Sequence, residues 1–271
     1  MRLGAVTLQN RDWPELRESW RRLDALGVES LWVTDHLANP FRPERPWLDG
    51  WTLLPALALE TERARVGALV SSLTLRNPAV LAKAAVTLDH LTGGRAELAL
   101  GAGGSRRDRE LAGARSASFT ELVGRTVALL ADESLQPRPV QRRIPITIGG
   151  HGDEALELAA RHADRWNTFG GSGLEAREAL ALARERNERL TALCERIGRE
   201  PATLTRSILL GYRFVRETPW RSAEAFLDVA NRWREAGFDE LIVYYPAETA
   251  MPEGAVAPGV FERAVELARE V

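Results

Sequence analysis

An acid and a histidine stand together at the end of one apolar segment of this sequence. Asp35 and His36 directly follow Ser30–Thr34, and two glycine clusters, GAGG from Gly101 and the pair Gly149-Gly150, also follow apolar segments. Glycine leaves the main chain bare, so a flat ligand can lie close to it. A site with bare main chain, one Asp-His pair and few other ionisable groups suits a protein whose reactive centre is a bound cofactor.

The second glycine cluster runs into the expected start of a helix. Gly149 and Gly150 are followed by His151, and the helical pattern begins at Asp153. Free amides at a helix N-terminus attract anions, so this segment is a candidate phosphate site. A helix whose first turn carries acids that complement its dipole, with no ligand, explains the same residues equally well.

The sequence lacks the residues that several other kinds of active site require. Lys83 is the only lysine and lies in a helical pattern, so a Schiff-base lysine at a strand end is not expected. The four histidines show no metal-binding spacing, and no metal site is predicted. A dinucleotide loop would need a third glycine two residues beyond Gly104, where Arg106 stands. The single cysteine, Cys194, is expected to be small apolar packing.

The pattern of the whole chain predicts the scaffold for these residues. Apolar runs alternate with helical patterns from end to end, which is typical of a closed parallel barrel with buried strands. The chain is therefore predicted to be a single (β/α)8 barrel domain over residues 1–271, with the functional residues at the carboxyl ends of its strands. The expected strands are Leu3–Leu8, Ser30–Thr34, Arg65–Val70, Ala96–Leu100, Pro145–Ile148, Arg165–Phe169, Ser207–Val215 and Glu240–Tyr245.

One helix can be predicted in detail. Asn77 is expected to cap it, Pro78 to occupy its first position and Gly93 to end it in the left-handed conformation. Its apolar face is predicted to carry Leu81, Ala84, Ala85, Leu88 and Leu91.

Composition limits the partners. The formal net charge of −2 provides no positive excess for nucleic acid, and the cluster from Arg106 to Glu110 is expected to be a solvated helix face. No membrane span or signal segment is apparent, so a cytoplasmic location is expected.

Four segments in order resemble the luciferase-like flavin-dependent barrel superfamily, and most closely its deazaflavin (coenzyme F420) branch. They are GVESLWVTDHL, the stretch from Val66 to Gly104, IPITIGGHGDEALELAARHADRWN and GFDELIVYYP. The resemblance implies a ring in the barrel mouth, faced by Asp35 and His36. His36 is expected to donate or accept a proton, or instead to be a hydrogen-bonded strap between strands, while Asp35 would position His36 or bond the ring edge.

The resemblance also implies the remaining cofactor contacts. Leu69 and Val70 would form a non-proline cis peptide behind the ring. Ala102 and Gly103 would lie along the cofactor tail, and Gly149 and Gly150, with His151 after them, would lie near its phosphate. Trp47 and Trp51 could wall the substrate pocket or simply pack beneath their loop.

Three functions remain open at this point. The first is an F420-dependent oxidoreductase that moves a hydride between the deazaflavin and a small organic substrate. The second is a two-component monooxygenase that uses FMN, and the third is a cofactor-free barrel with a binding or assembly role and a trans peptide at Leu69-Val70. Gly104 stands where sugar-phosphate dehydrogenases of this branch carry a glutamate, so that substrate is not supported. The shortened insertion between the fourth and fifth strands leaves the site more open or completed by a second subunit, and a homodimer is expected.

Overall fold

The computed structural model describes residues 1–103, 105–113, 117–211, 215–217, 219–245, 256–257 and 259–268. Within them a parallel sheet of nine strands runs in the order β3-β2-β1-β11-β9-β7-β6-β5-β4. These strands are β1 (Arg2–Thr7), β2 (Ser30–Val33), β3 (Arg65–Ala68), β4 (Ser71–Ser72), β5 (Leu98–Gly101), β6 (Ile146–Gly149), β7 (Arg165–Thr168), β9 (Thr205–Leu210) and β11 (Glu240–Tyr245).

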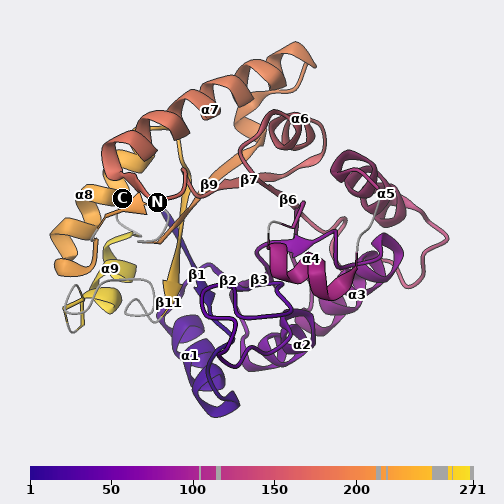
Figure 1. Cartoon of the computed structure of the whole chain (residues 1–271), viewed down its shortest axis with the longest axis horizontal. Helices are drawn as coiled ribbons and strands as arrows, with labels where there is room; N and C mark the ends of the chain where they lie inside the picture. The colour runs from indigo at the N-terminus through magenta and orange to yellow at the C-terminus, as the bar shows by residue number, and fades with distance from the viewer. Residues whose placement is uncertain are drawn as a thin grey trace.

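The two edges of this sheet meet. β3 and β4 are successive parts of one barrel position, separated by Leu69 and Val70. The amide of Val66 donates to the carbonyl of Arg95, and the amide of Glu97 donates to the carbonyl of Val66, which joins β3 to the chain entering β5. The sheet therefore closes into the predicted (β/α)8 barrel, with the helices around its outside (Figure 1).

The helices follow the strands in the expected order. They are α1 (Trp13–Leu26), α2 (Gly50–Glu60), α3 (Pro78–Thr92), α4 (Arg106–Ala112), α5 (Phe119–Ala131), α6 (Asp153–His162), α7 (Ala176–Arg196), α8 (Ala223–Glu235) and α9 (Val260–Ala268). Short 3-10 turns cover Pro201–Thr203 and Pro219–Arg221. The shortened insertion corresponds to the connection from β5 to β6, which contains only α4 and α5 as regular elements among its described residues.

The prediction for α3 is confirmed at both ends. The Asn77 side chain accepts from the Ala79 amide at 2.9 Å, and Gly93 has the left-handed φ of 64°. The predicted apolar face is wrong at Leu91, which is 43% exposed, because the buried face is carried by residues such as Ala82 and Val86 instead.

The predicted strand Ser207–Val215 is also too long. β9 ends at Leu210, and residues 212–214 lie outside the described residues. Val215 belongs to β10 (Val215–Arg216), which pairs with β8 (Leu174–Glu175) in a separate small sheet. The two ends of the predicted strand therefore belong to two different sheets.

The barrel interior has a polar end and an apolar end. Near the amino ends of the strands, the Arg165 guanidinium lies 2.8 Å from Glu97 and 3.1 Å from Glu240, and all three side chains are buried. Burial raises the pKa of Glu240 above its usual value. Towards the carboxyl ends a separate buried cluster contains Val6, Leu8, Trp32, Leu69, Ala99, Ile242 and Tyr244. This apolar cluster forms the floor beneath the candidate site.

Candidate functional site

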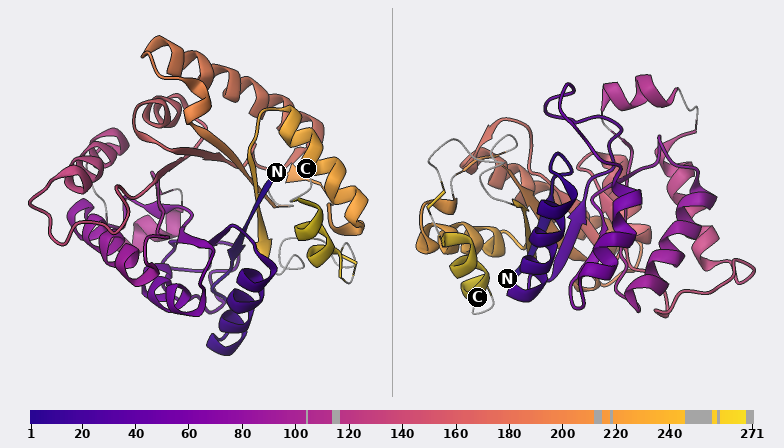
Figure 2. Two further views of the ribbon diagram at one scale, coloured as in Figure 1. Left: turned by 180° about the vertical axis from the view of Figure 1, so that it is seen from behind. Right: turned by 90° about the horizontal axis from the view of Figure 1, so that it is seen from below.

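The loop after β2 and helix α4 come together at the barrel mouth. In the side view of Figure 2, both project from the same end of the barrel, away from the N-terminus. The ring Nδ1 of His36 lies 2.6 Å from Oδ2 of Asp108, and the amide of Leu37 donates to Oδ1 of the same carboxylate at 2.9 Å. The His36 side chain remains 29% exposed, whereas that of Asp108 is 5% exposed. One ring edge of His36 is thus held by a buried acid while the residue stays accessible.

The expectation that the arginine-rich segment is a solvated face is wrong for this one residue. Asp108 is the only buried residue of α4, and its neighbours Arg107 and Arg109 are exposed. The sequence shows only an acid among arginines, and nothing local marks it as the partner of His36, 72 positions away.

Asp35 does not hold His36. Its carboxylate accepts from the Ser72 amide at 2.9 Å and from the Arg76 guanidinium at 2.6 and 3.2 Å. Arg76 also reaches Asp49 at 2.8 Å. Burial alone would lower the pKa of Arg76, but its hydrogen bonds and ion pairs with Asp35 and Asp49 raise it above its usual value. Asp35 therefore ties the loop after β2 to β4 and to the loop before α3, and the residue that holds His36 is Asp108.

The Leu69-Val70 peptide is cis, as the resemblance implies. The Val70 side chain then lies against two of the glycines at the ends of neighbouring strands. A Cβ placed on Gly101 would come within 2.2 Å of the Val70 side chain, and one on Gly149 would come within 2.5 Å. These two glycines make room for Val70, so their bareness serves packing of that side chain.

The other glycines behave differently. Gly103 has φ +80°, and a Cβ there would come within 2.2 Å of the Ser72 hydroxyl. The adjacent Ala102 is exposed. Gly104 lies outside the described residues. In the described part of the glycine cluster only Ala102 is exposed, and Gly103 lies against Ser72 and Thr74, whose hydroxyls hydrogen-bond to each other at 2.9 Å.

The first-turn acids of α6, Asp153 and Glu154, bond to residues outside the helix start. Gly152 occupies the N-cap and supplies no side-chain bond to the first turn. Asp153 pairs with Arg189 at 2.6 Å, and Glu154 accepts from the amide and hydroxyl of Thr120. Both carboxylates are engaged elsewhere, so the amides of the first turn retain their capacity to bind an anion.

His151 stands beside this helix start with an unsatisfied atom. Its ring lies edge-to-face with Phe169 at 4.9 Å, and its buried Nδ1 has no hydrogen-bond partner in the described structure. Burial and, secondly, the charge of Arg186 lower the pKa of His151.

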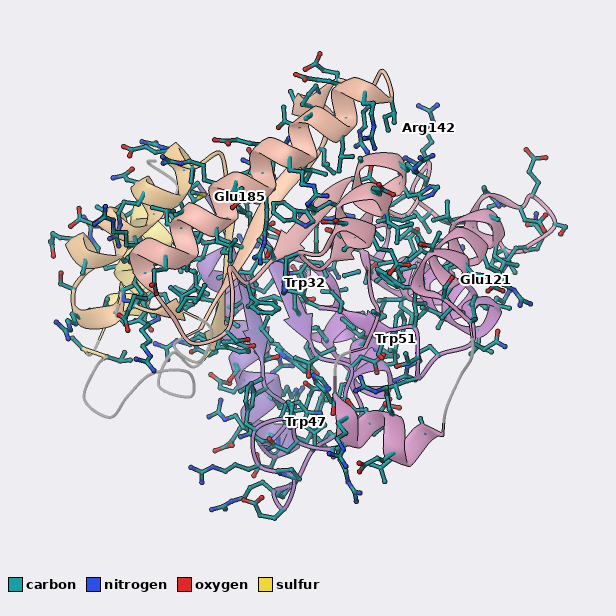
Figure 3. The ribbon with its side chains drawn as sticks, turned by 45° about the horizontal axis from the view of Figure 1, so that its top comes forward. Trp32, Trp47, Trp51, Glu121, Arg142 and Glu185 are labelled. Carbon is teal, nitrogen blue, oxygen red and sulfur yellow. The ribbon has the colours of Figure 1, made fainter. Side chains whose placement is uncertain are left out.

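Two tryptophans of the loop after β2 have different places. Trp47 lies edge-to-face with His36, with ring centroids 6.5 Å apart, and packs against the apolar floor cluster. Its buried Nε1 also has no partner among the described residues. Trp51 instead donates to Ser71 at 3.2 Å and lines a groove between α2 and α3. Figure 3 labels both, with Trp47 beside α4. Trp47 fits the pocket-wall interpretation, and Trp51 fits the packing interpretation.

Among the described residues, no group of three or more histidine, cysteine or acidic side chains could hold a metal ion. No helix in the described part of the chain is long and apolar enough to cross a membrane. Cys194 is buried, as expected, and burial raises the pKa of its thiol.

Residues 1–257 match the family described as luciferase-like monooxygenase. The chain belongs to this family. An F420-dependent glucose-6-phosphate dehydrogenase of Amycolatopsis mediterranei is 30% identical over 179 residues, which cover 57% of this chain and 53% of that protein. A phthiodiolone/phenolphthiodiolone dimycocerosates ketoreductase of Mycobacterium kansasii is 32% identical over 179 residues, covering 52% and 48% of the two chains. The match thus spans about half the length of these curated relatives.

The fold is shared over a longer range. The structure of an F420-dependent secondary alcohol dehydrogenase in complex with an F420-acetone adduct superimposes with a TM-score of 0.78, over 97% of this chain and 96% of that one, at 15% identity. At this identity the likeness establishes the luciferase-like barrel and nothing further.

A planar ring with a phosphate-bearing tail fits the residues of this mouth. The orphaned Trp47 Nε1 lies beside the accessible His36, and the orphaned His151 Nδ1 lies beside an uncapped helix start. Buried polar atoms are nearly always hydrogen-bonded in native proteins. Neither atom has a partner among the described residues, so both suit a bound ligand that supplies one.

Proposed function

We propose that this protein is an F420-dependent oxidoreductase that transfers a hydride between a deazaflavin and a small organic substrate bearing an alcohol or carbonyl group. The observation that carries the proposal is the accessible His36, fixed by a buried acid at the mouth of a luciferase-like barrel. Beside it lies the indole N–H of Trp47, which has no hydrogen-bond partner among the described residues. The names of two relatives, a dehydrogenase and a ketoreductase, support the same class of reaction.

The proposed cofactor contacts follow the geometry of the mouth. Leu69 and Val70 would support the ring from below, since both pack against the apolar floor cluster. Ala102 and Gly103 would lie along the tail. The first amides of α6, with Gly149, Gly150 and His151, would bind the phosphate. When bound there, a deazaflavin would supply the acceptor or donor of a hydride.

The chain itself would handle the proton and the oxygen. The indole N–H of Trp47 would donate to the substrate oxygen and orient it towards His36. As an alcohol is oxidised, its carbon gives up a hydride and its hydroxyl gives up a proton, which His36 would accept. In the reverse direction, His36 would return the proton to the carbonyl oxygen. Asp35 would hold the loop after β2 against β4 and the loop before α3, through Ser72 and Arg76. We also propose that Asp35 contacts the polar edge of the ring.

Two further features concern substrate and assembly. A sugar phosphate is not proposed, because the resemblance implies a glutamate for that substrate at the position where this chain has Gly104. We also propose that the chain forms a homodimer through α2 and α3. Their outer faces expose apolar side chains and border an apolar groove of about 540 Å³.

The test is a titration of the purified protein with F420, FMN and FAD, followed by optical spectroscopy and equilibrium dialysis. F420 is expected to bind, and substrate-dependent reduction of bound F420 should follow with secondary alcohols or other simple alcohols. His36→Asn and Trp47→Phe should retain F420 binding but reduce turnover, by roughly 100-fold or more for the loss of the proton acceptor. Binding of FMN alone would point to the monooxygenase alternative, and binding of neither ring to a cofactor-free barrel.

A further inference from the structure

Helix α4 buries no apolar side chain that could anchor it at the barrel mouth. Asp108 is its only buried residue, and the rest of the helix is solvent-exposed. Burying a carboxylate costs free energy unless its oxygens are hydrogen-bonded. Both oxygens of Asp108 are bonded, and both bonds go to the loop after β2. The contact of α4 with this loop is therefore built around one acid and one histidine.

We propose that Asp108 is a positioning residue that locks His36 in a single tautomer, with the ring hydrogen on Nδ1 and with Nε2 free to exchange a proton with substrate. This inference rests on the proposed function for its consequence in turnover. The lock itself is a property of the chain without any cofactor.

The chemistry of the contact fixes the tautomer. A carboxylate has no hydrogen to donate, so at 2.6 Å the hydrogen of the contact must lie on Nδ1 of His36. The neutral ring then carries its lone pair on Nε2. When Nε2 takes a proton, the carboxylate on the opposite side of the ring also stabilises the positive charge that forms.

The Leu37 amide makes the proposal sharply testable. It donates to Oδ1 of Asp108 and so fixes which oxygen faces which partner. In Asp108→Asn, the side-chain carbonyl must remain opposite the Leu37 amide, because an NH₂ group there would place two donors face to face. The new NH₂ group would then point at Nδ1 of His36, which could accept only without its hydrogen. The variant should therefore force the hydrogen to Nε2 and abolish the proton acceptor.

The charges around this pair do not provide a competing lock. Asp35 is engaged by Arg76 and Ser72, and Arg76 also pairs with Asp49. On α4, Arg106 and Arg107 pair with Glu110, and Arg109 donates to the carbonyl of Gly103. Trp47 meets the ring edge-to-face and carries no charge.

The experiment is long-range ¹H–¹⁵N correlation NMR of the histidine rings in the full chain, recorded without cofactor at a pH where the rings are neutral. Signals of His36 are identified by their loss in His36→Asn. The wild-type spectrum should show hydrogen on Nδ1, Asp108→Asn should show it on Nε2, and Asp108→Ala should show a mixture. Glu110→Gln makes the same change of charge on the same helix without touching His36, and it should keep the wild-type pattern.

The kinetic counterpart separates positioning from binding. With F420 bound, Asp108→Asn should lower kcat by roughly 100-fold or more with little change in KM, because the proton acceptor is lost while the binding surfaces remain. Hydrogen on Nε2 in the wild-type protein, or an unchanged ring in Asp108→Asn, would overturn the inference even if that enzyme is inactive. If Asp108→Asn does not fold, the wild-type and Asp108→Ala spectra decide. Failure of the proposed function would give a different result. The His36 tautomer would then be locked as predicted, but the protein would bind none of the three cofactors.

Discussion

At the scale of single residues, the surroundings of His151 disfavour its protonation. Burial comes first and the charge of Arg186 second, and both lower the pKa of this ring below its usual value. The folded chain therefore takes up the proton less readily than the unfolded chain does. The contribution of His151 to stability is complete above the unfolded pKa of about 6.5 and is lost as the pH falls towards the lower folded value.

The lowered pKa of His151 predicts how the free energy of unfolding changes with pH. The loss of stability between about pH 7.5 and pH 5.5 should be smaller in His151→Gln than in the wild-type protein, because glutamine does not titrate. Urea denaturation at a series of pH values measures it. His162→Gln should change the pH dependence in the same direction, since burial and Arg161 also lower the pKa of His162 at the other end of α6. An equal loss of stability in His151→Gln and wild type would contradict the prediction.

The sequence located some site residues and missed others for a physical reason. His36 is recognisable because it follows a strand and lies next to Asp35. Asp108 cannot be recognised from the sequence, because it contacts His36 only in the folded chain, where 72 positions separate the two residues. Nothing in the sequence marks Arg76 either, because its pairing with both Asp35 and Asp49 depends equally on tertiary structure. Of the two roles that the resemblance implies for Asp35, the positioning of His36 is wrong, because the Asp35 carboxylate bonds to Ser72 and Arg76 instead. The bond to the ring edge stays a prediction.

At the scale of elements, three consecutive strand positions are fitted to each other through Val70. Its side chain extends from the junction of β3 and β4 to the ends of β5 and β6, where Gly101 and Gly149 leave space for it. An added methyl group on Gly149 would come within 2.5 Å of a Val70 methyl but 3.6 Å from its Cβ. Removing the Val70 methyls should therefore relieve the clash.

This geometry predicts a strong coupling in a double-mutant cycle. Gly149→Ala should destabilise the apoprotein by about 1–3 kcal/mol through overpacking. In the double variant with Val70→Ala, the total loss should fall below the sum of the two single losses by about 1 kcal/mol or more. Chemical denaturation gives the four free energies. Gly124→Ala is the matched control, because nothing lies within 4 Å of its added Cβ, and its effect should be additive with Val70→Ala.

The elements themselves were predicted well where local chemistry decides them. Asn77, Pro78 and Gly93 delimit α3 through bonds made within a few residues, so the sequence was sufficient. Leu91 fits the helical period of the apolar face, yet it lies 43% exposed, whereas Ala82 and Val86, which the prediction left out, are buried. The rotation of a helix about its axis depends on its neighbours. Periodicity alone therefore does not determine which residues at the edge of the apolar face are buried.

At the scale of the whole molecule, the two most exposed large apolar side chains among the described residues lie on the neighbouring helices α2 and α3. Leu59 of α2 is 73% exposed and Val80 of α3 is 66% exposed, and Val80 lines the groove between these helices. Helix α2 is apolar around most of its circumference, in the sequence GWTLLPALALE. A helix of this kind is normally buried, and a second copy of the chain, as proposed above, would cover the outer face of α2.

The proposed dimer predicts a selective effect of one charge. Val80→Glu would place a carboxylate in the α2–α3 interface and should convert the protein to a monomer of 30.0 kDa, as measured by light scattering or sedimentation equilibrium. Ile197→Glu is the control, since Ile197 is an exposed apolar residue at the end of α7, which lies across the barrel from α2 and α3 (Figure 1). It should leave the mass unchanged. A wild-type mass of 30.0 kDa, or dissociation by the control to the same extent, would rule out this interface, and the exposed leucine and valine would then need another partner.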